Sequence, residues 1–436
     1  MKSNKSISLA TVFFLVMLTL ALALPNAAFA LQYGDFTYEV SGGTVTITGY
    51  SCPGGSAVIP ASIDGMPVVG IGDSAFEGFR SLTSVTIPDS VTNIGSYAFW
   101  GCSSMTSVTI PNSVTDIGYY AFLGCSTLIS VTIPNSVTSI WGGAFAGCSG
   151  LINIVVDASN TVYSSQDGVL YNKALTVLIQ YPGGKSGGFT IPDSITSIGG
   201  YAFDGCTGLT SVTIPNSVTA IKGAAFSRCT GLTKIAIPDS VTSIEDGTFY
   251  NCTGLTSVTI PDSVTSIGSH AFASCTSLTS VTIPSSITII WDWAFYGCAV
   301  LTKAYFLGNA PTMGTGVGGV FDGCASNFTV CYRIGNKGFS SPTWYGYPAR
   351  VCADNQCAAE AIYGRDSEET ELLREYRDNV LNKIPEGQEL IKTYYKLSPT
   401  VKILLERNPL LKNRAKAFID SMLPGIRKKV EESSSK

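Results

Sequence analysis

Hydrophobic and polar residues alternate along most of the chain in a pattern that recurs at a fixed interval. The stretch from Leu255 to Cys275 is one complete unit, in which Leu-Thr-Ser-Val-Thr-Ile is followed by Pro-Asp-Ser and a second apolar series. The interval is twenty-three residues, as the step from Pro88 to Pro111 shows. A fixed period of this length is typical of a solenoid of stacked coils. The unit's proline falls at Pro88, Pro111, Pro134, Pro192, Pro215, Pro238, Pro261 and Pro284.

Each unit predicts the same short elements. Ser84 and Thr86 alternate with apolar residues, and this period of two predicts a half-buried strand. The Ile-Pro-Asp/Asn-Ser step predicts a turn, because proline presets φ and Asp or Asn bonds nearby backbone groups. Val91 to Ile94 predicts a second extended piece, and Gly-x-x-Ala-Phe-x-Gly-Cys predicts a tight helical turn. The expected core of one coil is Leu82, Val85, Ile87, Val91, Ile94, Ala98, Phe99 and Cys102.

The repeats are flanked at both ends and interrupted once. Residues 31–80 predict a β-hairpin around Ser41-Gly42-Gly43 and a first degenerate repeat, and the hairpin would cover the open end of the solenoid. The predicted solenoid spans residues 81–350. Pro134 and Pro192 lie more than two periods apart, and the additional chain predicts a hairpin insert at about 157–188. Residues 340–349 predict a terminal cap.

The composition changes near residue 354. Residues 354–436 hold 15 Lys+Arg and 14 Asp+Glu, half of the 58 charged residues of the chain (27 basic and 31 acidic). Apolar residues at helical spacing predict four short amphipathic helices, of which the last runs from Asn408-Pro409 to about Leu423, before Pro424-Gly425. We therefore expect a separate all-α domain at 354–436.

The first 30 residues have the layout of a secretory signal peptide. Lys2 and Lys5 precede an apolar run from Leu9 to Leu24, and Ala28-Phe-Ala30 supplies a small-residue cleavage site. An uncleaved membrane anchor is the alternative, but sixteen apolar residues are short for a bilayer span. We expect cleavage near Ala30, export, and no transmembrane segment in the mature chain.

Nine of the thirteen cysteines lie three residues after the Phe of an Ala-Phe or equivalent pair. Phe79 occupies this position in the first unit, which indicates apolar volume rather than ligation or redox chemistry. Disulfides between stacked coils stay an alternative, because successive coils lie roughly 5 Å apart. Of the cysteines outside this series, Cys331 and Cys352 are the favoured disulfide pair. The nine are Cys102, Cys125, Cys148, Cys206, Cys229, Cys252, Cys275, Cys298 and Cys324.

The unit Leu-x-x-Val-x-Ile-Pro…Val-x-x-Ile-Gly-x-x-Ala-Phe-x-Gly-Cys resembles the BspA-type leucine-rich repeat of bacterial surface proteins. The resemblance covers about residues 31–350. It implies a β-rich leucine-rich-repeat solenoid with one main parallel strand per coil, and binding to proteins or surfaces without a common catalytic activity. The tail resembles a C-terminal domain named for its Cys-Phe-Ile box, but the box here is Cys357-Ala-Ala, which puts any function of Cys357 in doubt.

No catalytic, cofactor or metal site is predicted. The single histidine, His270, occupies a repeat position that varies among Tyr, Gly, Ala and Trp, so a catalytic dyad or triad is not indicated. The Asp and Asn residues after the repeat prolines could be imagined as a calcium ladder, but turn formation accounts for them. A net charge of −4 does not indicate a nucleic-acid partner.

Aromatic residues at or beside the variable position are the strongest candidates for binding. If exposed, they would suit contact with a protein or a surface glycan, whereas packing between coils is the alternative. The sequence thus favours an exported, surface-associated binding protein over a structural envelope component, and both over an enzyme. The candidates, with His270, are Tyr97, Trp100, Tyr120, Trp141, Tyr201, Tyr250, Trp291, Trp293 and Tyr296.

Overall fold

The computed structural model describes residues 31–52, 54–314, 318–333, 335–352, 368–383, 385–388 and 408–434, with the single residues 390, 401 and 405. The predicted signal peptide and Cys357 lie outside these residues. The chain divides into two compact units, which meet in sequence at Phe145 and Ala146 and are described separately.

The N-terminal unit begins with the predicted hairpin, which is part of a three-stranded meander. β2 and β3 pair antiparallel, and Gly42 and Gly43 between them both have positive φ (58° and 78°), as a two-residue hairpin turn requires. β1 adds to the other edge of β2. The strands of this unit are β1 (Leu31–Tyr33), β2 (Phe36–Ser41), β3 (Thr44–Tyr50), β4 (Gly55–Val58), β5 (Ser62–Ile63), β6 (Met66–Ile71), β7 (Leu82–Thr86), β8 (Asn93–Ile94), β9 (Ser107–Thr109), β10 (Asp116–Ile117), β11 (Ser130–Ile133) and β12 (Ser139–Ile140).

Each regular coil contributes two parallel strands, as the alternation predicts. In the first ladder β7 pairs with β9 and Val85 lies opposite Val108; in the second, β8 pairs with β10 and Ile94 lies opposite Ile117. Both registers equal one period of the sequence repeat, so every coil places equivalent side chains beside one another. The stack is a leucine-rich-repeat β-solenoid.

The segment predicted as a tight helical turn is not helical. Trp100 N–H bonds the Tyr97 carbonyl at 3.0 Å, but Tyr97 and Gly101 have positive φ (58° and 71°), which a right-handed helix excludes. Alternate residues donate to the next coil instead: Phe99 N–H bonds Ala121 O at 2.7 Å and Gly101 N–H bonds Leu123 O at 2.8 Å. We call residues 95–102 and their equivalents the turn segment, and these bonds the turn ladder.

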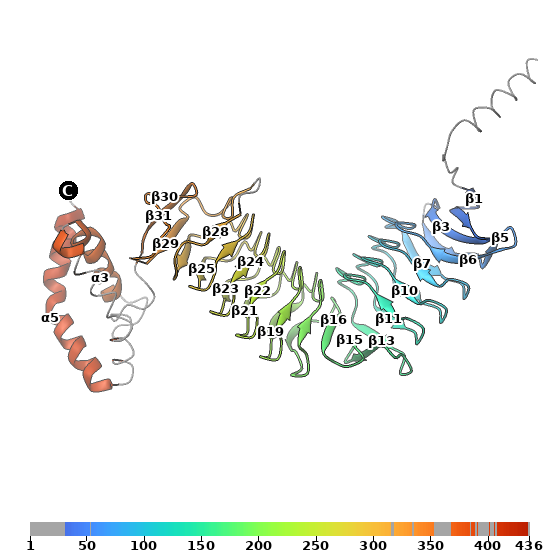
Figure 1. Ribbon diagram of the computed structural model, residues 1–436, viewed down its shortest axis with the longest axis horizontal. Helices are drawn as coiled ribbons and strands as arrows, with labels where there is room; N and C mark the ends of the chain where they lie inside the picture. The colour runs from blue at the N-terminus through green and yellow to red at the C-terminus, as the bar shows by residue number, and fades with distance from the viewer. Residues whose placement is uncertain are drawn as a thin grey trace, which may run out of the picture. The chain divides into compact units, whose positions relative to one another are not determined.

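The C-terminal unit contains the insert and most of the coils. Where the sequence predicts a hairpin, β14, β15 and β16 form a three-stranded antiparallel meander, and β16 then pairs parallel with β18. β19, β21, β23 and β25 follow one another in successive coils (Figure 1). The strands are β13 (Asn153–Val156), β14 (Tyr163–Gln166), β15 (Val169–Asn172), β16 (Val177–Gln180), β17 (Gly187–Thr190), β18 (Ser197–Ile198), β19 (Leu209–Thr213), β20 (Ala220–Ile221), β21 (Lys234–Ala236), β22 (Ser243–Ile244), β23 (Ser257–Thr259), β24 (Ser266–Ile267), β25 (Ser280–Ile283), β26 (Ile289–Ile290), β27 (Lys303–Phe306), β28 (Thr312–Met313), β29 (Thr329–Tyr332), β30 (Thr343–Trp344) and β31 (Tyr347–Val351).

Phenylalanines of the turn segments stack through the core of each unit. Phe226, Phe249 and Phe272 are fully buried, with ring centroids 5.5 and 5.2 Å apart and nearly parallel planes. The N-terminal unit repeats this geometry, because Phe99 lies 5.0 Å from Phe76 and 5.2 Å from Phe122. We call these rings the phenylalanine stack.

The nine repeat cysteines are free thiols, so the alternative of disulfides between coils is not realised. Cys252 Sγ donates to the Phe226 carbonyl at 3.1 Å, and Cys102 Sγ donates to the Phe76 carbonyl at the same distance. Burial raises the pKa of Cys102 and Cys298 to about 12. The thiols of Cys102 and Cys298 therefore fill volume, donate to carbonyls and stay protonated at neutral pH.

The last coils pair β25, β27, β29 and β31 in parallel, and β30 returns antiparallel to β31. Buried Trp344 packs edge-on against Phe306 at 5.4 Å and also contacts Phe339. Cys331 and Cys352 form a disulfide, with Cα atoms 5.0 Å apart. The end of the stack is thus closed by aromatic side chains and a covalent link.

The described C-terminal helices are α3 (Glu368–Asn379), the 3-10 turn η1 (Leu381–Lys383) and α5 (Pro409–Ser434). The predicted end near Leu423 is wrong, because α5 continues through Pro424 and Gly425; proline removes one backbone donor, and the residues around it keep the helix. Residues 385–388 are also helical, although they begin with Pro385 and include Gly387. Most of the predicted second and third helices lies outside the described residues. None of the helices in the described ranges is long and apolar enough to cross a bilayer.

Candidate binding surface

The variable repeat position has a left-handed backbone in every coil where it is described. φ lies between 54° and 70° at these residues, whatever side chain is present. We call it the first αL position. Non-glycine residues rarely adopt this conformation, and bulky ones pay a steric penalty there. Its residues in the regular coils are Tyr97, Tyr120, Gly143, Tyr201, Ala224, Gly247, His270 and Trp293.

The N-terminal unit carries a continuous series of half-buried and exposed rings, which we call the N-terminal aromatic cluster. Tyr97 stacks on Tyr120 at 5.2 Å and contacts Trp100 at 5.6 Å. Tyr119 contacts Tyr120 at 6.5 Å and Trp141 at 4.9 Å. The outer rings of Trp100, Tyr119 and Trp141 are 41%, 48% and 48% exposed. Five rings from three coils therefore form one surface, in which the rings also support each other.

The sequence analysis missed one member of this cluster, Tyr119. Its signal was the doublet Tyr119-Tyr120, which places one ring at the first αL position and another directly before it. The contact with Trp141, which belongs to the next coil, depends on the stacking of coils and could not be read from local sequence.

A second group, the C-terminal aromatic cluster, comprises Tyr250, His270, Trp291, Trp293 and Tyr296. His270 lies between Trp293 and Tyr250, at ring distances of 4.9 and 6.4 Å. Trp293 is half-buried, because its indole packs over Gly318, where any Cβ would collide with Nε1. Tyr250, Trp291 and Tyr296 are exposed. The structure thus brings together Tyr250, His270 and Trp293, and it packs the His270 ring at a tilt against Trp293 and edge-on against Tyr250.

Tyr201, the remaining candidate, is half-buried and lies outside both clusters. Its phenol lies near the guanidinium of Arg228, whose Nε bonds Asp204 Oδ1 at 3.0 Å and whose Nη2 bonds Oδ2. Asp204 is 2% exposed, so the ion pair links a buried carboxylate to an exposed cation. The hydrogen bonds that Arg228 donates to Asp204 raise the pKa of Arg228, despite the opposing effect of burial.

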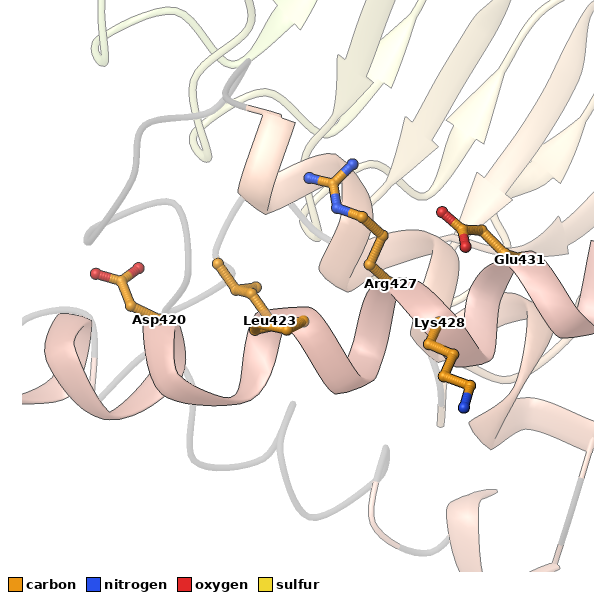
Figure 2. A pocket seen from close by; sticks show the side chains of 6 residues that line it. Asp420, Leu423, Arg427, Lys428 and Glu431 are labelled. Carbon is orange, nitrogen blue, oxygen red and sulfur yellow. The ribbon is translucent and has the colours of Figure 1, made fainter.

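No metal-binding cluster accompanies these surfaces in the described ranges. They contain no group of three or more His, Cys, Asp and Glu side chains that could hold a metal ion. A surface hollow of about 450 Å³ lies along α5, and Figure 2 shows side chains that line it, among them Asp420, Leu423, Arg427, Lys428 and Glu431. These side chains come from a single helix, and the charged ones are exposed, so the hollow does not gather groups around a substrate.

The repeats match the family model of the BspA type leucine rich repeat region, in six copies over residues 65–182 and 185–302. These residues make up more than half of the chain. The chain belongs to the BspA-type leucine-rich repeat family. The resemblance of residues 354–436 to a Cys-Phe-Ile-box domain has no such match and stays a prediction.

Solved structures of bacterial leucine-rich repeat proteins are similar to this chain. The pneumococcal vaccine antigen PcpA is 20% identical, with 74% of this chain and 98% of that chain covered and a TM-score of 0.53, which supports the fold. A leucine-rich cell surface protein from Faecalibacterium prausnitzii is 30% identical over 65% of this chain and 96% of that chain, with a TM-score of 0.39. A leucine-rich repeat protein from Eubacterium ventriosum is 23% identical over 72% and 95%, with a TM-score of 0.48. No curated protein matches the chain.

Proposed function

We propose that this protein is an exported, cell-surface-associated binding protein without catalytic activity, which holds a protein or surface glycan through rings on the turn segments. The N-terminal aromatic cluster carries the proposal. Its five rings contact one another across three coils, and three of them are more than 40% exposed. Large, rigid aromatic side chains supply most of the binding energy in many protein interfaces.

Surface association has support from the family and from the N-terminal sequence. The BspA-type repeats and the cell-surface protein among the similar structures favour this location. Lys2, Lys5, the apolar run and Ala28-Phe-Ala30 favour export with cleavage near Ala30. The intact mass of the exported protein tests this directly, because cleavage removes residues 1–30.

Binding is tested with the chain from Leu31 to Lys436 against purified extracellular and envelope proteins and an array of glycans. We expect saturable binding to at least one of them. Replacing Trp100, Tyr119 and Trp141 together by Ala should weaken that binding about tenfold or more, since the outer rings would be removed.

Ile129→Ser is the matched control, because Ile129 is as exposed as the three rings but belongs to no ring contact. It should leave both binding and thermal unfolding unchanged. Unchanged binding by the triple variant would remove the aromatic cluster from the function. Retention in the envelope without saturable binding would favour the structural envelope component instead.

A further inference from the structure

Each turn segment has a second residue with positive φ, four positions after the first, and we call it the second αL position. Glycine occupies it in most coils, as this backbone favours. Three consecutive coils differ: Arg228, Asn251 and Ser274 stand there with φ of 58°, 57° and 60°. The glycines of the other coils are Gly78, Gly101, Gly124, Gly147, Gly205, Gly297 and Gly323.

In two of these three coils the first αL position is small, with Ala224 and Gly247. These two coils therefore carry their larger side chain at the second αL position instead of the first. This side chain is polar, whereas the residue at the first position is aromatic in most other coils. Glycine would suit the backbone better at all three sites, so neither the fold nor the turn ladder explains the polar side chains.

The three polar residues stand on successive rungs of the turn ladder. Arg228 N–H bonds Tyr250 O at 2.7 Å, Asn251 N–H bonds Ala273 O at 2.8 Å, and Ser274 N–H bonds Tyr296 O at 2.7 Å. Their backbones are thus about 4.8 Å apart from coil to coil. The side chains of Asn251 and Ser274 form no hydrogen bond within the described residues, so their polar groups can bond a ligand.

Asp204 fixes the guanidinium of Arg228 and neutralises its charge. The bonds to the buried carboxylate use Nε and Nη2, which leaves the Nη1 donors for other partners. A group held in this way presents planar donors in one orientation without attracting anions strongly.

Two exposed tyrosines accompany this polar row. Tyr250 and Tyr296, which are 41% and 46% exposed, each directly precede the second αL position of their coils. The equivalent residue of the coil between them is Ala273, which is buried. Two coil spacings correspond to roughly 10 Å. At this repeat position, the methyl group of Ala273 is thus the only side chain between the two tyrosines.

We propose that Arg228, Asn251 and Ser274, with Tyr250 and Tyr296, form a binding site for a neutral hexose unit of a glycan. Sugar hydroxyls donate and accept hydrogen bonds, and the row offers both kinds of partner. The C–H face of a pyranose carries slight positive charge and packs on the negative face of an aromatic ring. The inference rests on the proposed function, because it assigns a ligand class to one part of that surface.

The test uses the chain from Leu31 to Lys436 on an array of neutral and acidic glycans. Wild-type protein should bind neutral hexose-containing glycans, and the double variant Asn251→Gly/Ser274→Gly should bind them about tenfold or more weakly. Its melting temperature should stay the same or rise, because glycine relieves both αL conformations. A second variant, Asp204→Ala/Arg228→Gly, removes the ion pair without leaving a buried charge and should lose binding similarly.

Ser74→Gly is the matched control. Ser74 also has positive φ (57°), so its replacement relieves the same backbone strain outside the site and should leave glycan binding intact. Equal binding by wild-type protein and Asn251→Gly/Ser274→Gly would overturn the site. Binding to a protein but to no glycan would also overturn the site, although the proposed function would still stand. Binding only to acidic glycans would contradict the assignment of a neutral ligand.

Discussion

The residues on the inward side of the turn segment stay nearly constant from coil to coil, whereas those on the outward side vary. Inward, Phe and Cys recur with little change, because rings such as Phe249 pack on the rings of both neighbouring coils and thiols such as Cys252 and Cys275 donate to phenylalanine carbonyls. Outward, the αL residues change from coil to coil. The backbone bonds of the turn ladder do not depend on the outward side chain, so this side can vary while the coil stays the same.

The two αL positions differ in a similar way. The second is mostly glycine, which shows the residue that this backbone prefers, while the first carries Tyr97, Tyr120, Tyr201, His270 or Trp293 in five coils. A non-glycine residue in this conformation costs roughly 1–2 kcal/mol, and a stacked aromatic pair contributes about 0.5–1.5 kcal/mol. Where rings stack, as Tyr97 and Tyr120 do, the contact thus offsets much of the penalty, but it provides no clear surplus of stability. This balance favours a role for the rings at the surface.

The largest expected effect is a difference in stability between variants of two neighbouring residues, Phe249 and Tyr250, which lie on opposite sides of one turn segment. Phe249→Ala should reduce the free energy of unfolding by about 3–5 kcal/mol, because it opens a cavity in the phenylalanine stack. Tyr250→Ala should change it by less than about 1 kcal/mol, because Tyr250 is exposed. Guanidinium chloride unfolding of both variants measures the difference, and similar losses would contradict the division into two sides.

The next effect tests Asp204, a buried carboxylate that holds the outward side chain of Arg228. Arg228→Gly should destabilise the protein by about 3 kcal/mol, because the carboxylate of Asp204 loses its partner. Asp204→Ala/Arg228→Gly should recover most of this loss. The same unfolding measurement decides, and equal stability of the single and double variants would show that the ion pair does not act as a unit.

The buried thiols predict a pH dependence. Burial raises the pKa of Cys298 to about 12, so the folded state keeps a proton that the unfolded chain, with an ordinary pKa near 9, loses as pH rises. The contribution is complete below pH 9 and declines above it, by about 1 kcal/mol at pH 10. Cys298→Ser keeps a donor for the Phe272 carbonyl but cannot ionise. Its stability should therefore fall less than that of wild-type protein between pH 8 and 10, and parallel pH curves would refute the assignment.

The smallest effect concerns the first αL position. Tyr120→Gly relieves positive φ but removes contacts with Tyr97 and Tyr119, so its free energy of unfolding should lie within about 1 kcal/mol of wild-type. Calorimetric melting measures this change. A loss of several kcal/mol would mean that the N-terminal aromatic cluster is mainly structural.

Local patterns and the repeat explain why much of the molecule was predictable. Alternation around Val85 and the apolar Val91 to Ile94 indicated the two strands, and the replacement of Cys by Phe79 indicated that the cysteines fill volume. Patterns of this kind depend on which side chains are buried, and burial selects residue types strongly. The third strand of the insert, β14, was less accessible because Ser164 to Gln166 carry no apolar alternation. The length of α5 was less accessible because Pro424 favours a helix end locally while its neighbours continue the helix.

The sequence by itself determined the coil, its period and its core, because each depends on apolar residues repeated in one register. Only the tertiary structure decided what the outward residues do. Positive φ at a Tyr, His or Trp leaves no mark in the sequence, and the contacts between Tyr119 and Trp141 or between Asp204 and Arg228 join residues about one repeat apart. Stacking of the coils brings these side chains together, and the candidate binding surfaces exist only because of it.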